Sequence, residues 1–299
     1  MKFVLTIALA LGFILTSLGQ ESSFWFKSDS LNPKRLSIST SILASTWVGG
    51  TYALSKVWYK EFKKTPFHTF NDATDWLQMD KLGHIYTASH LSRSYSQLYN
   101  WCGLKPKQSL VIGSALGFGF QTTIELLDAK NSAWGFSWYD MVANGIGTAF
   151  FATQELLWNE QNFLLKFSYS PTKFADLRPE VLGNSFSERI LKDYNGQIYW
   201  LTFSPFSFKK ERKNMEWLCI SLGYSANAKL IGDQETVWIN NQVYTSQRQF
   251  FFSLDINPEK LNIKRNWVKT LIKPLNWLKF PFPSLELTGR KLSGNWLTY

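Results

Sequence analysis

PKQSLVIGSALGFGFQTTIELLDA, residues 106–129, is the strongest helical signal in the chain. No charged residue occurs from Gln108 to Ile124, so a helix here would be apolar around most of its surface. Gln121 and Glu125 interrupt that apolar character four residues apart, which is one turn of a helix. The stretch therefore predicts a helix of a bundle that lies outside the lipid or leans on it, rather than a plain membrane span.

Three further segments around it have helical length and an apolar face, and breaks at Pro66, Gly103 and Gly135 separate them. They are Leu36–Phe62, Asp75–Trp101 and Trp138–Trp158. Residues 36–160 are thus expected to form a bundle of about four α-helices. Small residues at helical spacing would let backbones approach closely, in a soluble bundle or in a membrane. They are Gly113, Gly117, Gly145 and Gly147.

The pattern changes after Glu160, where short alternating segments replace the helical period. Every second residue is apolar in 218–224 and in 250–256, and residues 197–204 and 236–244 look like further strands, the latter with a turn at Asn240-Asn241. Residues 161–196, rich in Pro and Gly, are expected to be a linker, and 197–299 a β-rich, basic and aromatic region. The fold class is α+β. A membrane barrel ending at Tyr299 and a sheet packed on the bundle both remain open.

The N-terminus has the features of a signal peptide. Lys2 gives a positive start, an apolar run extends to Leu18, and cleavage is expected after Gly19. The alternative is a retained anchor, but the run is shorter than the roughly 20 residues of a membrane span. Residues 1–19 are thus a signal peptide and 20–35 an N-terminal extension. The expected location is the cell envelope, in the periplasm or at the outer membrane.

Charge and cysteine content narrow the partners. The chain has a net charge of +10, and residues 161–299 carry 19 Lys and Arg against 11 Asp and Glu. In an exported protein such a basic, Trp-rich region favours a membrane surface over nucleic acid, although scattered solvated lysines would give the same count. The sequence identifies no protein partner. Its two cysteines, Cys102 and Cys219, form no disulfide framework, and Cys219 is expected to be a buried thiol.

Ionisable and amide residues lie one helical turn apart on three of the predicted helices. The pairs are Asp80 with His84, Gln121 with Glu125, and Asp140 with Asn144. Helical bundles build metal and catalytic sites from such stripes. The candidates for catalysis, or for holding a divalent metal ion, are Asp80, His84, Glu125 and Asp140. Lys81 and Asn144 are the candidates for substrate binding, with Lys81 neutralising an anionic substrate and Asn144 orienting it.

Each candidate also has an ordinary structural explanation. Asp140 follows Ser137 by three residues, so it could simply cap its helix. Asp80 and Lys81 could be solvated, and a lone His84 on an apolar helix is usually a structural histidine. His68 and His90 are expected to be structural. Sequence patterns of phosphate-loop, dinucleotide-binding, zinc-protease and serine-hydrolase enzymes do not occur in the chain.

DKLGH at 80–84, Glu125 and GFSWYDMVANGIG at 135–147 together resemble the YfiM-like family of predicted periplasmic proteins of unknown function. They are similar, more distantly, to VanZ-like membrane proteins linked with glycopeptide resistance. The resemblance covers about residues 70–155 and implies an envelope location and a polar site, without a known reaction. A structural or assembly role is the leading hypothesis. The alternative is a metal-dependent or acid/base enzyme acting on an envelope lipid or glycan, with a transporter-like role behind it.

Overall fold

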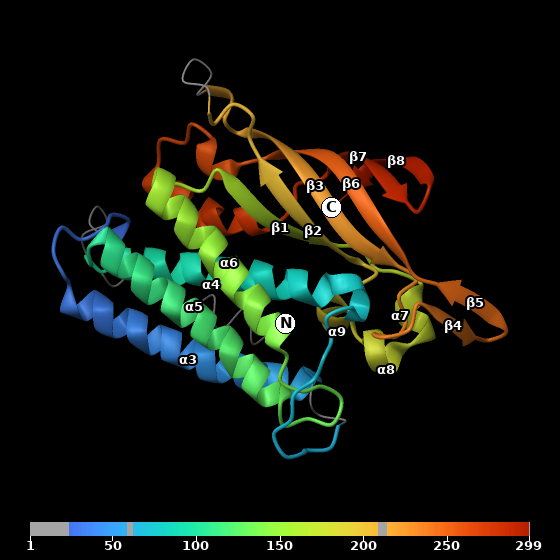
Figure 1. The fold of residues 1–299 in the computed structure, drawn as a ribbon. Helices are drawn as coiled ribbons and strands as arrows, with labels where there is room; N and C mark the ends of the chain where they lie inside the picture. The colour runs from blue at the N-terminus through green and yellow to red at the C-terminus, as the bar shows by residue number, and fades with distance from the viewer. Residues whose placement is uncertain (1–23, 59–61, 209–213, 299) are drawn as a thin grey trace.

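The computed structural model describes residues 24–58, 62–208 and 214–298. The expected signal peptide and its cleavage site lie outside the described residues. Helices occupy residues 33–158 and a β-rich region follows, which confirms the α+β fold class (Figure 1). The long helices lie below the sheet in this view, and helix α4 (Met79–Trp101) runs beneath it.

Four long helices form the first part of the chain: α3 (Pro33–Trp58), α4 (Met79–Trp101), α5 (Pro106–Asp128) and α6 (Trp138–Trp158). They match the four expected segments closely, and the main differences are that α3 begins at Pro33 and that the short 3-10 helix η1 (Asp75–Gln78) precedes α4. Among the described residues, α5 is the helix long and apolar enough to span a membrane by length and composition.

Glycines bring α4 into close contact with both of its neighbours. A Cβ atom added at Gly113 of α5 would lie 2.3 Å from the backbone nitrogen of Ser96, and one at Gly147 of α6 would lie 2.2 Å from the carbonyl oxygen of Ile85. Gly117 approaches Ser92 in the same way, whereas Gly145 faces open space. The predicted close approach thus holds for three of the four glycines, and it draws the polar stripes of three helices together.

Six antiparallel strands form one sheet in the order β1-β2-β3-β6-β7-β8. Their bounds are β1 (Phe163–Tyr169), β2 (Gln197–Phe203), β3 (Leu218–Asn227), β6 (Gln247–Ile256), β7 (Phe282–Thr288) and β8 (Lys291–Thr298). β4 (Thr236–Ile239) and β5 (Gln242–Thr245) form a separate hairpin, which confirms the expected turn at Asn240-Asn241.

The segment 161–196, expected to be a linker, holds edge strand β1 and three short helices, α7 (Phe174–Leu177), α8 (Pro179–Leu182) and α9 (Phe186–Lys192). Strand β1 pairs with β2 along its whole length, from Phe163 to Tyr169. Between β6 and β7, the 3-10 helix η3 (Pro258–Lys260) and helix α10 (Asn266–Ile272) lead through η4 (Lys273–Trp277) to β7.

Helix α4 joins the bundle to the sheet. Tyr86 donates a hydrogen bond to the carbonyl oxygen of Trp277 at 2.9 Å, and His90 donates from Nε2 to that of Leu165 at 2.7 Å. One guanidinium nitrogen of Arg93, Nη2, donates to both carboxylate oxygens of Glu259, at 2.8 and 2.9 Å. These contacts hold α4 against β1 and against the η3–η4 connection, while α5 and α6 also pack on α4.

Candidate functional site

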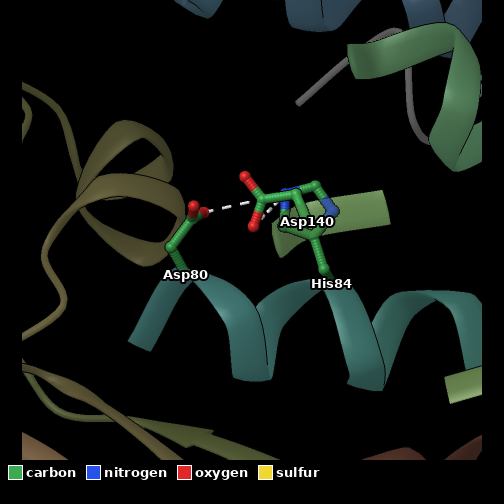
Figure 2. Close-up of side chains that lie close together, drawn as sticks. All are labelled: Asp80, His84 and Asp140. Atoms are coloured by element: carbon green, nitrogen blue, oxygen red, sulfur yellow. Dashed lines mark ion pairs between the residues drawn. The ribbon is translucent and has the colours of Figure 1, made fainter. Parts of the chain in front are cut away.

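The three predicted polar pairs converge on one centre between α4, α5 and α6. His84 Nε2 lies 3.5 Å from Glu125 Oε1, 3.8 Å from Asp80 Oδ1 and 3.9 Å from Asp140 Oδ1. Figure 2 shows Asp80 and His84 rising from the same helix toward Asp140. One potential ligand atom from each of these three residues lies within 4.8 Å of the others. We use the name polar centre for the six residues that meet here: Asp72, Asp80, Lys81, His84, Glu125 and Asp140.

Lys81 bridges three of the carboxylates of the polar centre. Its Nζ lies 2.7 Å from Asp72, 2.8 Å from Asp140 and 3.2 Å from Asp80. Burial alone would lower the pKa of Lys81, but the charges of Asp80 and Asp140 outweigh it and raise that pKa above its usual value. Lys81 therefore supplies a fixed positive charge within the protein.

The second ring nitrogen of His84 is held by an amide. Asn144 Oδ1 lies 3.0 Å from His84 Nδ1 and accepts a further hydrogen bond from Gln121 at 3.2 Å. Asn144 Oδ1 can only accept, so the shorter of the two contacts holds Nδ1 in its protonated form, while Gln121 Nε2, 3.3 Å from Nδ1, would donate to the unprotonated form. Nε2 is thereby directed at the three carboxylates, the arrangement in which an outer partner orients a metal-binding imidazole.

Ser137 caps α6 through only half of the expected capping box. Its Oγ accepts a hydrogen bond from the backbone N–H of Asp140 at 3.0 Å. The backbone N–H of Ser137 donates to Glu125 Oε2 instead of to the Asp140 side chain, and Ser137 Oγ donates to Asp72 at 2.6 Å. The carboxylate of Asp140 is consequently free to face Lys81 and His84.

Most of the polar centre is withdrawn from solvent. The side chain of Glu125 is 1% exposed, that of Asp140 6%, and that of Asp80, the most open, 28%. Burial raises the pKa of Glu125 to about 8, and burial together with the charge of Asp80 raises the pKa of Asp140. Burial opposes ionisation of Asp80 as well, but His84 and Lys81 hold its pKa below the usual value.

The polar centre also has an unfilled hydrogen-bonding position. Glu125 Oε1 is buried without a hydrogen-bond partner among the described residues, and it points toward His84 Nε2. Four carboxylates, those of Asp72, Asp80, Glu125 and Asp140, face one lysine and one histidine. An apolar bundle tolerates such a surplus of acid only if protons or a bound cation neutralise it. The arrangement can therefore hold a divalent cation or exchange protons.

Three residues that belong to the polar centre or form hydrogen bonds with it were not predicted from the sequence as site residues. Asp72 and Ser137 join through loops that precede α4 and α6, and Tyr194 donates a hydrogen bond to Asp80 Oδ1 at 3.1 Å. Tyr194 comes from the segment between α9 and β2, 114 residues after Asp80, so no local spacing could reveal it. Of the other histidines, His68 contacts Thr65 and Pro66 in a loop, and His90 is buried against the sheet.

Residues 68–155 match a family model described as "Predicted periplasmic lipoprotein (DUF2279)". The matched range includes every member of the polar centre but not Tyr194. The match supports an uncharacterised periplasmic family and an exported protein of the cell envelope. No curated protein and no solved structure matches the chain.

Proposed function

We propose that this chain is an exported envelope protein whose helical bundle binds one divalent transition-metal ion. His84 Nε2 and the carboxylates of Asp80, Glu125 and Asp140 are the ligands. The observation that carries the proposal is the convergence of three carboxylates from three helices on His84 Nε2, at 3.5 to 3.9 Å, while Asn144 holds Nδ1. One imidazole with several carboxylates suits Zn²⁺ or Mn²⁺ better than Ca²⁺ or Mg²⁺, which prefer oxygen alone.

Charge balance supports a dication. With Lys81 as the fixed cation, the four carboxylates leave a surplus of three negative charges when all are ionised and His84 is neutral. The raised pKa values of Glu125 and Asp140 express the cost of that surplus when nothing but protons relieves it. A bound dication would relieve most of it and would give Glu125 Oε1 its missing partner.

The role that this geometry favours is structural. An ion held by α4, α5 and α6 would pin the three helices together, and Tyr194 would tie the segment before β2 to the same point through Asp80. The near-complete burial of Glu125 and Asp140 suits a closed structural site better than an open catalytic one. The resemblance to YfiM-like proteins, and more distantly to VanZ-like ones, rests on these same residues. We infer a structural or assembly role in the cell envelope.

Metal analysis of the purified protein tests the proposal. We expect about one Zn²⁺ or Mn²⁺ per chain, and a melting temperature that falls when a chelator removes the ion and recovers when it is returned. His84→Ala should lose the ion. His68→Ala is the matched control, because His68 lies in a loop outside the polar centre, and it should keep the ion.

The proposal fails if the wild-type protein binds neither ion and melts at the same temperature with and without chelator. It also fails if His84→Ala and His68→Ala retain the metal equally well.

A second candidate is an enzyme acting on an envelope lipid or glycan, favoured by one observation. Asp80 is 28% exposed and gives the polar centre a side open to solvent, while Glu125, with its pKa raised to about 8, could exchange protons near neutral pH. Lys81 would then face an anionic substrate and Asn144 would orient His84.

Glu125→Gln separates the two roles in a complementation assay run beside thermal melts. A structural role predicts that function falls only in proportion to the folded protein that is lost. An enzyme predicts that function disappears while the folded fraction stays near that of the wild type.

A further inference from the structure

One face of the six-stranded sheet is apolar along two whole rows. Along one row across the sheet, paired residues are apolar or aromatic on every strand: Phe167, Tyr199, Tyr224, Phe250, Leu287 and Leu292. The adjacent row on the same face holds Leu165, Leu201, Leu222, Phe252, Leu285 and Gly294. A sheet with one solvated face normally presents polar residues there.

The opposite face is buried and mixes polar residues with a small hydrophobic cluster of Ile198, Trp200 and Phe251. One row across it reads Leu164, Thr202, Ser221, Ser253, Ser284 and Asn295. Lys166 and Asp255, both with fully buried side chains, form an ion pair at 3.2 Å, and Ser221 donates a hydrogen bond to Asp255 at 3.1 Å. These polar groups are satisfied inside the protein, so the inner face buries paired polar residues beside its hydrophobic cluster, while the outer face is apolar along both of its rows.

Helix α4 covers only part of the apolar face. Leu82, Ile85 and Tyr86 of α4 line a cavity of about 150 Å³ with residues of β1, β2 and β3. From the edge of this cavity, where Leu222 lies, to β8, seven large apolar side chains of β3, β6, β7 and β8 are 41 to 66% exposed. We call them the apolar sheet face: Leu222, Phe250, Phe252, Leu254, Leu285, Leu287 and Leu292. A continuous exposed apolar surface of this kind marks an interaction site.

Exposed cations lie near both ends of the apolar sheet face. At one end, Arg248 begins the exposed row of β6 and Arg290 lies in the turn between β7 and β8, whereas Lys291, the first residue of β8, pairs with Thr288 on the opposite face. At the other end, Arg265 and Lys269 lie on or next to α10, in the connection from β6 to β7. The two acidic residues of β6 and β7, Asp255 and Glu286, belong to the opposite face. The surface is therefore apolar in its middle and positive at its ends.

We propose that the apolar sheet face rests in the acyl layer of an anionic lipid membrane. Apolar side chains gain free energy on leaving water for the acyl layer, and the flanking cations would meet lipid phosphates. Charge complementarity favours this occupant over a second copy of the chain, because two copies packed face to face would bring like cations near one another. The envelope location supported by the family match supplies such membranes.

Flotation of the mature chain with vesicles tests the proposal. We expect it to float with vesicles of phosphatidylglycerol and phosphatidylethanolamine, and much less with phosphatidylcholine alone. Phe252→Glu with Leu285→Glu alters a cross-strand pair of the face and should weaken binding at least about tenfold, from the burial energy of two large side chains. Val142→Glu with Ile146→Glu, on α6 at 61 and 51% exposure, adds the same charge elsewhere and should leave binding nearly unchanged.

A fluorescent label provides a second readout that does not depend on a charged variant folding. Cys102 and Cys219 are both buried, so a cysteine introduced by Leu285→Cys can be labelled selectively with an environment-sensitive dye. Its emission should shift to the blue with anionic vesicles and be quenched by acyl-chain quenchers, whereas a label at Val142→Cys should change little.

Three results would overturn the proposal. The first is equal loss of binding in the two glutamate variants, and the second is a Leu285 label that stays in water while the protein floats. The third is a wild-type chain that sediments as a dimer, becomes a monomer in Phe252→Glu with Leu285→Glu, and does not bind vesicles. That third result would assign the face to a second copy.

Discussion

His84 and His90 lie on the same helix, yet their imidazole rings meet opposite surroundings. His84 faces three carboxylates and donates to Asn144, whereas His90 is buried between Tyr86 and Trp277 and donates to a backbone carbonyl. They are six positions apart, which is not close to a whole number of helical turns of 3.6 residues. The two side chains therefore lie on different sides of α4. One histidine thus belongs to the polar centre and the other to the contact between α4 and the sheet.

His90 should make the protein less stable in mild acid. Burial lowers the pKa of His90 to about 3, from an ordinary value of 6.5. The unfolded chain therefore takes up a proton below pH 6.5 that the folded chain refuses, so stability falls as the pH drops. The loss from this group between pH 7.5 and 5 is about 2 kcal/mol.

Urea unfolding at several pH values checks this expectation. His90→Gln should flatten the dependence by about that amount, and His68→Gln should leave it as in the wild type. An unchanged slope in His90→Gln would contradict the assignment.

Helical spacing in the sequence was enough to predict those members of the polar centre that lie on one face of a helix. Asp80 with His84, and Asp140 with Asn144, could be found because residues four apart share a helix face. Nothing local indicates Tyr194, which reaches Asp80 only through the packing of the sheet on α4. The capping-box spacing of Ser137 and Asp140 was ambiguous for a physical reason. In a complete capping box the Asp140 side chain would accept a hydrogen bond from the backbone N–H of Ser137. In this structure Glu125 accepts that hydrogen bond instead.

At the scale of elements, the close approach of α6 to α4 depends on the absence of a side chain at Gly147. At Gly147 a Cβ atom would lie 2.2 Å from Ile85 O, a backbone atom that cannot give way without moving the helix. Gly145, on the same helix, has nothing within 4 Å of such an atom. Asp140 and Asn144 lie on this helix, so its position also sets the geometry of the polar centre.

Gly147→Ala and Gly145→Ala form a matched pair. Gly147→Ala should lower the free energy of unfolding by about 1 to 3 kcal/mol through overpacking, and should weaken metal binding. Gly145→Ala should raise it by up to about 1 kcal/mol, because alanine is the better helix former. Denaturant unfolding of both variants measures the difference, and equal stabilities would contradict the close packing of α4 and α6.

Strand β1 illustrates what element prediction from one sequence misses. Residues 163–169 read FLLKFSY, and neighbouring Phe163, Leu164 and Leu165 obscure the alternation that marks the other strands. The chain forms a strand here because β2 supplies a partner for all seven residues. The four long helices needed no such partner to be recognised, since each carries its own apolar periodicity over more than 20 residues.

At the scale of the whole molecule, Lys166 connects this edge strand to β6, which is fourth in the sheet order. Its ammonium group lies 3.2 Å from Asp255 and donates to the carbonyl oxygen of Ile256. The two side chains are wholly buried, so each depends on the other for neutralisation. On this evidence we propose that the C-terminal β-rich unit begins near residue 161 rather than at 197.

Lys166→Met should test that proposal in the intact chain. It leaves Asp255 buried without its cation and should cost about 3 to 5 kcal/mol of stability. Adding Asp255→Leu should recover much of the loss, because no charge then remains unpaired. Thermal melts of the single and double variants give the comparison. A single variant as stable as the wild type would show that β1 contributes little to the sheet.

The metal proposal makes a claim about identified atoms, and X-ray absorption at the zinc edge tests it most directly. Zinc-loaded protein should show one imidazole and two or three carboxylate oxygens at about 2.0 to 2.2 Å. Because His84→Ala should lose the ion, its zinc signal should disappear, whereas His90→Gln should keep both the zinc and the imidazole contribution. A zinc spectrum that is unchanged by His84→Ala, or a protein that retains no zinc after dialysis, would contradict a metal centre at His84.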